Sequence, residues 1–293
     1  MGRPHVPPTS PRRLRLPPET ARPERPTARP RPVPVITALL PPTVRAAEVR
    51  TTPGPNSSPS PPGPTHAANH HEDPNTTLHP EERAHLQHAV PKRRRQFALT
   101  RSCARRALHA LGAPPAPILP GPHGAPQWPV GIVGSMTHRQ GYCAAALARG
   151  TDLLSLGIDA EPNEPLPPAV LNTFALPAER DSLRPCPHHS GVHHDRLLFS
   201  AKESVYKAWF PLTHHPLRPQ HLQIRLHCPP AMPTSPTGTP SHTGTFHARI
   251  LPGPGPAPNS PVAPHFFTGR WLADQSLILT AVTVPHTTPS AGQ

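Results

Sequence analysis

The segment from Phe199 to Trp209 places an acid and a base at a spacing that suits chemistry. Ser200, followed three residues later by Glu203, is typical of a capping box and predicts a helix that begins there. On such a helix Glu203 and Lys207 lie four residues apart on one face, while the small and apolar residues between them point into a core. The two side chains then form either a reactive carboxylate–ammonium pair or only a helix cap with an exposed ion pair worth about 0.3–0.5 kcal/mol.

A second acidic motif lies upstream, in the segment LLSLGIDAEP at residues 153–162. Its apolar residues alternate with small and acidic residues, which is the period of a half-buried strand, and Pro162 ends the pattern. Asp159 and Glu161 therefore share one face, about 6.6 Å apart along the strand. Two carboxylates so placed, with Glu203 as a third, supply the oxygen ligands with which proteins hold Mg²⁺ beside substrate phosphates.

These motifs resemble those of a known family, the 4′-phosphopantetheinyl transferases of the surfactin- and enterobactin-synthetase (Sfp/EntD) type. The two family signatures stand here as GIDAE, residues 157–161, and KESVYK, residues 202–207. Three further segments agree, and all five follow in the expected order across most of residues 78–217. These three segments are residues 80–108, GSMTH at 134–138 and AWFPLT at 208–213.

The resemblance implies a fold, a reaction and a set of partners. The fold is α+β, a pseudo-symmetric pair of α+β lobes in one monomer, with coenzyme A in the cleft between them. The reaction moves the 4′-phosphopantetheine arm of coenzyme A to a serine of an acidic apo acyl or peptidyl carrier protein and releases adenosine 3′,5′-bisphosphate. Such enzymes serve fatty acid, polyketide, nonribosomal peptide or siderophore biosynthesis, including secondary metabolism, and the sequence does not identify the pathway or the carrier.

The resemblance also assigns roles to individual residues. Asp159, Glu161 and Glu203 hold Mg²⁺ against the pyrophosphate of coenzyme A, so Asp159 is also a substrate contact. Lys207 is a catalytic residue and, together with Lys202, steadies the phosphates. Glu203 takes the serine proton, directly or through a metal-bound water. A displacement at phosphorus needs its developing charge neutralised in this way and its nucleophile brought into line.

A basic segment supplies candidate contacts to the nucleotide end of coenzyme A. Seven basic residues lie between Lys92 and Arg106 with no acid among them, and such a run is usually a solvated face. Arg101 lies beside the apolar stripe of the predicted helix, Arg93 flanks it, and planar guanidinium groups match phosphate oxygens. The resemblance singles out Arg93 and Arg101 as nucleotide contacts, and His138 within GSMTH as a hydrogen-bond partner of a coenzyme A phosphate.

Periodicity predicts the elements that carry these residues. A short helix begins near Pro80, a second helix starts at Lys92 and stops at Gly112, and GSMTH forms a small turn before the apolar run at 142–148. Strands are predicted at residues 130–133, 221–226, 266–272 and 276–284. The loop at residues 117–129 is a cluster of turn residues. Relatives carry lysines there, where this chain has Pro120 and His123, so the loop is not assigned as a site.

Composition predicts how the chain is divided. With 52 prolines and 34% hydrophobic residues among 293, the core must be concentrated in part of the chain. Residues 1–72, rich in Pro and Arg, are expected to form a disordered tail. We expect an N-terminal lobe at residues 73–150 and a C-terminal lobe at 151–285, with a flexible insertion at about 229–264 and a free tail at 286–293.

Composition also limits the class of protein. No apolar run approaches the roughly 18 residues of a membrane helix and no secretory signal is visible, so we expect a soluble, cytoplasmic protein without a membrane partner. Four scattered cysteines favour free thiols, and the histidine pairs at 188–189 and 193–194 lack zinc-ligand spacing. The net charge of +13 leaves a nucleic-acid-binding protein as one alternative, although the main interpretation involves no nucleic acid. A catalytically inactive paralogue that binds coenzyme A is the other alternative.

Overall fold

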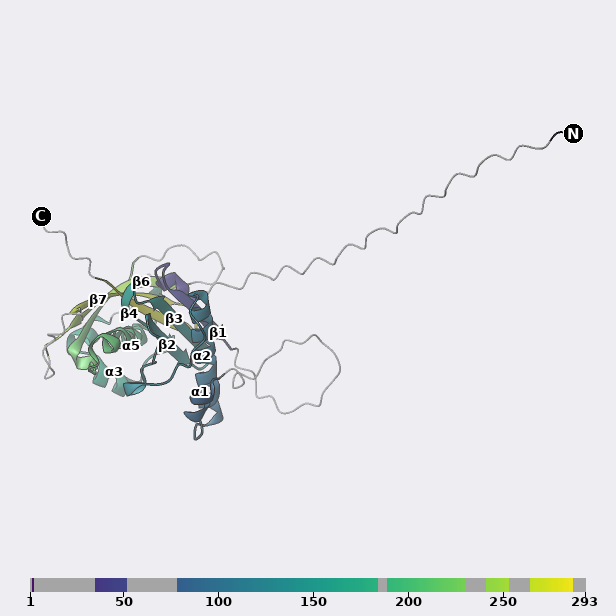
Figure 1. The fold of residues 1–293 in the computed structure, drawn as a ribbon. Coiled ribbons are helices and arrows are strands. Elements are labelled where there is room, and N and C mark those ends of the chain that lie inside the picture. Colours follow the sequence, from purple (N-terminus) through teal and green to yellow (C-terminus); the bar gives the residue numbers. More distant parts are fainter. Residues whose placement is uncertain are drawn as a thin grey trace, which may run out of the picture. The chain divides into compact units, whose positions relative to one another are not determined.

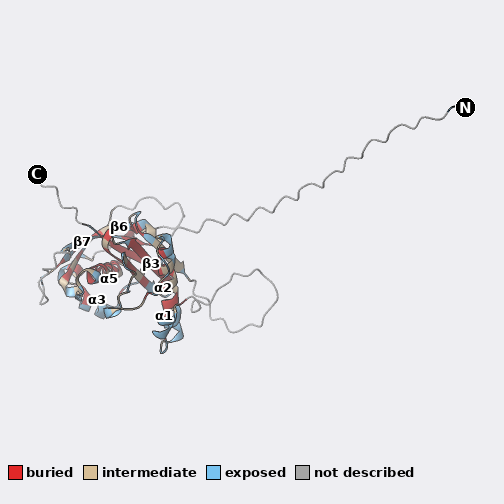
Figure 2. Cartoon of the chain, in the orientation of Figure 1, coloured by how far each residue is buried: buried red, intermediate tan, exposed pale blue. Residues whose placement is uncertain are grey.

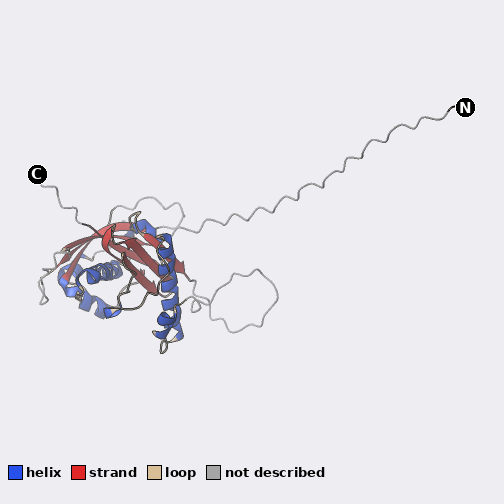
Figure 3. Cartoon of the chain, viewed as in Figure 1, coloured by secondary structure: helices blue, strands red, loops and turns tan. Residues whose placement is uncertain are grey.

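The structure, a computed structural model, describes residues 2, 35–51, 78–183, 189–229, 241–252 and 264–286. The unit Val33–Gln293 contains two antiparallel sheets, each packed against one long helix (Figure 1, Figure 3). No helix in the described part of the chain is long and apolar enough to cross a membrane. The predicted α+β class is therefore confirmed.

The first sheet has three strands in the order β1-β3-β2. Figure 2 shows the central strand β3 buried along almost its whole length, because strands flank it on both edges and helix α2 packs Ala104 and Leu108 against it. The strands are β1 (Arg45–Arg50), β2 (Ile132–Arg139) and β3 (Tyr142–Arg149). The helices of this half are η1 (Val35–Leu39), α1 (Pro80–Ala84), α2 (Pro91–Ala110) and η3 (Pro122–Gly124).

The second sheet has five strands in the order β4-β8-β7-β6-β5. Helix α5 lies on it and buries Leu197, Ala201 and Val205 in a core shared with Phe246 and Trp271. The strands are β4 (Leu153–Pro162), β5 (Leu222–His227), β6 (His242–Ile250), β7 (Phe266–Ala273) and β8 (Leu277–Pro285). The helices of this half are α3 (Pro168–Phe174), α4 (Pro177–Ser182), α5 (His194–Thr213) and η5 (Pro219–His221).

Gly157 of β4 allows a close approach between β4 and α5. A Cβ atom at this position would clash with the carbonyl oxygen of Ser204 and lie 2.7 Å from the backbone nitrogen of Ala208, so only glycine fits. Ser155, two residues earlier on the same face, donates a hydrogen bond of 2.8 Å to the carbonyl oxygen of Ala208. The glycine of the GIDAE motif therefore sets the distance between the strand that carries Asp159 and the helix that carries Lys207.

The prediction that residues 1–72 form a disordered tail is wrong for residues 35–51. Strand β1 pairs with β3 over all its residues, and Ile36 of η1 is fully buried at 0% exposure. Glu48 of β1 accepts hydrogen bonds from the Tyr142 hydroxyl at 2.9 Å and from the Ile36 backbone nitrogen at 3.2 Å. This segment contains apolar residues but shows no regular helical or strand period, and its pairing partner lies far along the chain. The rest of the predicted tail lies outside the described residues.

Three other predictions need correction. The predicted insertion at 229–264 contains strand β6, which pairs with both β5 and β7, while residues 230–240 and 253–263 lie outside the described residues. GSMTH belongs to β2 and forms no turn. Helix α5 begins at His194, so Ser200 lies inside the helix and does not cap it. The strand predicted at 130–133 covers only the start of β2, which extends to Arg139. The other predicted strands, and the helix predicted from Lys92, begin and end within about two residues of the observed ones.

Candidate active site

The centre of the site is where α5 meets the end of β4. The Lys207 Nζ atom lies 2.6 Å from Asp159 Oδ1 and also donates to the carbonyl oxygen of Ile158 at 3.1 Å. Asp159 is 5% exposed, and it accepts further hydrogen bonds from Ser200 Oγ at 2.9 Å and from Thr137 Oγ1 at 3.3 Å. Side chains from β2 and α5 therefore hold this carboxylate in one orientation, with a lysine ammonium against it.

Glu203 lies one turn before Lys207 on the same helix face and is half-buried. Among the described residues its carboxylate forms neither a hydrogen bond nor an ion pair. Burial raises the pKa of Glu203, the negative charge of Asp159 raises it further, and Lys207 opposes both effects. A carboxylate with free oxygens and a raised pKa is suited to accept a proton near neutral pH.

A hollow of about 440 Å³ opens beside these groups. Its walls come from the loop at residues 121–128, from residues 134–136 of β2, and from α5, which contributes Glu203, Tyr206 and Lys207. Glu203 and Tyr206 also line a smaller hollow of about 140 Å³ on their other side, with Phe174 and Leu217. Glu203 therefore lines both hollows, an arrangement that would let a base reach a different substrate in each.

A second hollow of about 280 Å³ lies next to the first and is cationic. Arg93, Arg101 and His138 line it, which confirms that the fold brings these three predicted residues together. The residues that line both this hollow and the larger one are Gly124, Pro126 and Met136.

The basic residues that line this hollow differ in their hydrogen bonds and in their pKa shifts. The Arg93 Nη1 atom donates a hydrogen bond to His138 Nε2 at 2.6 Å. Burial is the largest cause that lowers the pKa of His138, and the positive charge of Arg93 lowers it further, which favours the neutral imidazole. Arg101 is 7% exposed and its guanidinium carbon lies 3.5 Å from the centre of the Phe97 ring. Burial lowers the pKa of Arg101 to about 10, which still leaves it charged at neutral pH.

Glu161 shares the strand face of Asp159, as predicted, but it is already paired. Its Oε2 atom lies 3.2 Å from Arg196 Nη1, and Arg196 also donates to the carbonyl oxygens of Glu164 and Pro165, both at 3.1 Å. Burial raises the pKa of Glu161 to about 7, Asp159 adds to the rise, and Arg196 opposes it. The sequence showed no signal for Arg196, because it lies outside both motifs.

The three predicted metal ligands fit a divalent cation by their chemistry, since carboxylate oxygens are the ligands that Mg²⁺ prefers. Asp159 contributes to the raised pKa of both Glu161 and Glu203, so the cluster carries negative charge that its neighbours do not fully offset. Within the described residues no group of three or more His, Cys, Asp or Glu side chains is arranged to hold a metal ion. Lys207 contacts one oxygen of Asp159, and Arg196 contacts one oxygen of Glu161. For a cation to bind to these two oxygens, the Lys207 and Arg196 side chains must move away from them.

The role predicted for Lys202, contact with substrate phosphates, stays a prediction that the surroundings of this side chain do not favour. Lys202 is 2% exposed, and its Nζ atom lies 2.7 Å from Glu179 Oε2. It also donates to the carbonyl oxygens of Phe174 at 3.2 Å and Pro219 at 2.9 Å. Because Lys202 lies five residues before Lys207, it points to a different side of α5, where an ion pair with α4 takes its charge.

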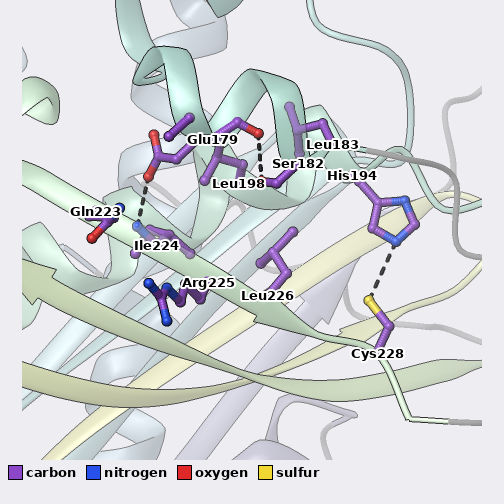
Figure 4. Close-up of a pocket in the computed structure, with 11 residues that line it drawn as sticks. Glu179, Ser182, Leu183, His194, Leu198, Gln223, Ile224, Arg225, Leu226 and Cys228 are labelled. Atoms are coloured by element: carbon purple, nitrogen blue, oxygen red, sulfur yellow. Dashed lines mark hydrogen bonds between the residues drawn. The ribbon is translucent and has the colours of Figure 1, made fainter.

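A further hollow of about 430 Å³ lies along β5, between this strand and helices α4 and α5 (Figure 4). His194 Nε2 and Cys228 Sγ lie 3.5 Å apart at one end of it. It contains none of the predicted site residues. His188 and Cys186 lie outside the described residues.

A lysine–carboxylate pair, a second carboxylate beside it and a neighbouring cationic hollow together form a site whose chemistry suits a phosphate-bearing ligand. Comparison with known proteins identifies the family. The 4′-phosphopantetheinyl transferase N-terminal domain matches residues 81–148, and the 4′-phosphopantetheinyl transferase superfamily matches residues 155–248.

Individual relatives agree. The chain is 49% identical over 214 residues to 4′-phosphopantetheinyl transferase Svp of Streptomyces mobaraensis, covering 73% of this chain and 81% of the relative. It is 43% identical over 214 residues to PptT of Mycobacterium tuberculosis, covering 73% and 88%. It is 44% identical over 205 residues to Npt of Nocardia iowensis, covering 70% and 88%. The chain belongs to the 4′-phosphopantetheinyl transferase family and is a transferase of this type; the surfactin- and enterobactin-synthetase subtype stays a prediction.

Proposed function

We propose that this chain transfers the 4′-phosphopantetheine arm of coenzyme A to a serine hydroxyl of an apo carrier protein, with Glu203 and Lys207 as its catalytic residues. The observation that carries the proposal is the Lys207–Asp159 pair at 2.6 Å beside Glu203, whose carboxylate has no hydrogen bond or ion pair among the described residues, in a chain of this family. The alternative of an inactive paralogue is not favoured, because all three carboxylates are present.

Coenzyme A binding follows from the two adjoining hollows. Arg93, Arg101 and His138 line the cationic hollow, which suits the phosphate-bearing nucleotide end of the molecule. The larger hollow, with Lys207 on its wall, then takes the pyrophosphate and the pantetheine arm. The Lys207 ammonium neutralises charge on the pyrophosphate oxygens, and Asp159 holds that ammonium in place.

The chemical step is a displacement at the phosphorus atom that bears the pantetheine arm. The serine oxygen forms a new bond to this phosphorus, and the bridging P–O bond of the pyrophosphate breaks. Adenosine 3′,5′-bisphosphate leaves with the bonding electron pair, and the serine proton passes to the Glu203 carboxylate. Glu203 lies between the two hollows that it lines, so it is within reach of a hydroxyl entering from one side and a phosphate held on the other.

The same residues would hold a magnesium ion. Asp159, Glu161 and Glu203 are the proposed ligands, and a divalent cation bound there would offset negative charge on the pyrophosphate. Incubation with an apo carrier protein, coenzyme A and Mg²⁺, followed by intact-mass measurement, tests the proposal. We expect the carrier to gain one phosphopantetheine group, and an unmodified carrier would contradict the proposal.

Replacement of Glu203 by Gln separates a catalytic role from a structural one. Glutamine keeps the shape of the side chain but neither accepts a proton nor provides a negative ligand. We expect turnover to fall by at least about a hundredfold, the usual size of a general-base contribution, with little change in melting temperature. Asp159→Asn should behave in the same way, and a well-folded Glu203→Gln protein with normal turnover would refute both assignments. The monomeric state and a cytoplasmic location stay predictions from the sequence.

A further inference from the structure

Glu82 of α1 is a fully buried carboxylate that the proposed mechanism does not use. It is 0% exposed, and both of its oxygens are saturated with hydrogen bonds. Oε1 accepts from the backbone nitrogen of Ile118 at 2.9 Å and from Arg105 at 3.1 Å. Oε2 accepts from Arg105 at 2.9 Å and from the backbone nitrogen of His79 at 3.0 Å. This one side chain therefore ties α1 to α2 and to the segment that leads into the loop at residues 121–128.

Ile118 links Glu82 to the coenzyme A hollow. Its N–H group is held by Glu82, and its carbonyl oxygen accepts a hydrogen bond of 3.2 Å from Arg101 Nε. Arg101 is held on its other side by the ring of Phe97 at 3.5 Å. Nε is engaged and one face is stacked, and within the described part of the chain the two terminal nitrogens of the guanidinium make no hydrogen bond, so they can meet a ligand in the hollow that Arg101 lines.

We infer that Glu82 is a positioning residue for coenzyme A binding, which acts by fixing Ile118 and, through it, the guanidinium of Arg101. This inference rests on the proposed function, because it takes coenzyme A as the ligand of Arg101. It extends the binding site to a side chain that touches neither substrate. The charge of Glu82 also favours the charged form of Arg101, against the burial that disfavours it.

The chain contains a matched counterpart that distinguishes positioning from simple stabilisation. Glu179 of α4 stands in the sequence Pro-Ala-Glu-Arg at 177–180, as Glu82 stands in Pro-Glu-Glu-Arg at 80–83. Glu179 is 3% exposed and accepts from the backbone nitrogens of Leu176 at 2.8 Å and Ile224 at 2.7 Å (Figure 4). It also pairs with Lys202 at 2.7 Å. The two carboxylates thus perform the same structural task in the two halves, but only Glu82 is connected to Arg101.

The test compares Glu82→Gln with Glu179→Gln in the full chain. Melting temperature and the dissociation constant for coenzyme A, measured by calorimetry without carrier protein, are the two readouts. We expect both variants to melt at a lower temperature, because each loses a buried ion pair. Only Glu82→Gln should weaken coenzyme A binding, by about tenfold, the effect of a lost hydrogen bond to a charged group. Its Michaelis constant for coenzyme A should rise while turnover at saturating coenzyme A changes little.

A double-mutant cycle tests whether the effect passes through Arg101. In an Arg101→Ala background Glu82→Gln should have no further effect on coenzyme A affinity, since the group that it positions is gone. If Glu82→Gln does not fold, Glu82→Asp keeps the charge but withdraws it from Ile118, and should weaken binding in the same selective way. Equal losses of affinity in the Glu82 and Glu179 variants, or additive effects with Arg101→Ala, would overturn the inference. A wild-type chain that does not bind coenzyme A would instead contradict the proposed function.

Discussion

The surroundings of Glu161 disfavour the ionised form of its carboxyl group. Its side chain is 21% exposed and lies near Asp159, so burial and a like charge together raise its pKa from 4.5 to about 7 in spite of Arg196. Between these two pH values the folded state binds more protons than the unfolded state. The free energy of unfolding therefore falls as pH rises from about 4.5 to about 7, and the loss is complete above that range.

Glu161→Gln should remove the part of the fall in the free energy of unfolding, between about pH 4.5 and pH 7, that ionisation of Glu161 causes. In the presence of a chelator we expect the variant to be more stable than the wild type at pH 8, by up to about 3 kcal/mol, and little different near pH 4.5. Chemical denaturation at the two pH values measures this difference. Addition of Mg²⁺ at pH 8 should stabilise the wild type more than the variant, because a cation relieves the same repulsion.

Glu164→Gln provides the control for that experiment. Glu164 lies three residues away in the same charged region but is exposed to solvent. We expect its replacement to leave the pH dependence of stability unchanged. A Glu161→Gln protein that is less stable than the wild type at pH 8 would show that the Arg196 ion pair outweighs the cost of burying the charge.

Helix α5 carries two lysines five residues apart whose environments differ completely. Lys202 is enclosed between α4 and α5 with Glu179, whereas Lys207 has a side chain 27% exposed and lines the hollow beside Glu203. Removal of one member of a buried ion pair leaves the other charge without compensation, at a cost of about 3–5 kcal/mol. The same family signature therefore places one lysine in a buried ion pair and the other on the wall of the larger hollow.

Replacing each lysine by Met tests this division. Lys202→Met should lower the melting temperature strongly, while the protein that remains folded keeps near-normal turnover. Lys207→Met should lose about a hundredfold or more in turnover, because a cation aimed at the reacting phosphates is gone. It should also melt below the wild type, because Asp159 is left buried without its lysine partner. Thermal denaturation and steady-state kinetics on both variants measure the contrast, and a Lys202→Met protein of normal stability but low turnover would return Lys202 to the site.

At the scale of the whole molecule, the segment of residues 35–51 is part of the folded unit although its sequence looks like the start of a tail. Ile36, Leu39 and Val44 are buried in a core that also contains residues of β3 from the first sheet and of β4, β7 and β8 from the second sheet. Strand β1 forms one edge of the first sheet. Burying each such side chain contributes about 1.5–3 kcal/mol. The segment therefore contributes to both sheets at once.

Truncation should reveal this contribution. A chain that begins at residue 33 retains η1 and β1, and we expect it to melt close to the full chain. A chain that begins at residue 52 loses both elements, and its melting temperature should fall by about 10 °C or more, if it folds at all. Thermal denaturation with a transfer assay compares the two, and equal stability would show that β1 is dispensable.

Local spacing placed the candidate residues of each motif on a common face, and the resemblance of the two motifs to a known family gave them a predicted chemistry. Asp159 and Glu161 share a face because strands alternate, and Glu203 and Lys207 share one because a helix turns every 3.6 residues, so these pairs are set within a few positions of the chain. The helix from Lys92 and the strands at 153–162, 221–226, 266–272 and 276–284 were predictable for the same reason, since their residue patterns are local.

The tertiary structure alone decided which partner each charged side chain meets. Lys202 pairs with Glu179, Arg196 with Glu161 and Arg105 with Glu82. Strand β1, which precedes α2 in the sequence, pairs with β3, which follows it. These contacts join residues that no helical or strand period relates, and they form only when the two sheets bury their faces against the helices. For that reason the family resemblance assigned Lys202 to the substrate and composition assigned residues 35–51 to the tail, whereas the structure pairs Lys202 with Glu179 and β1 with β3.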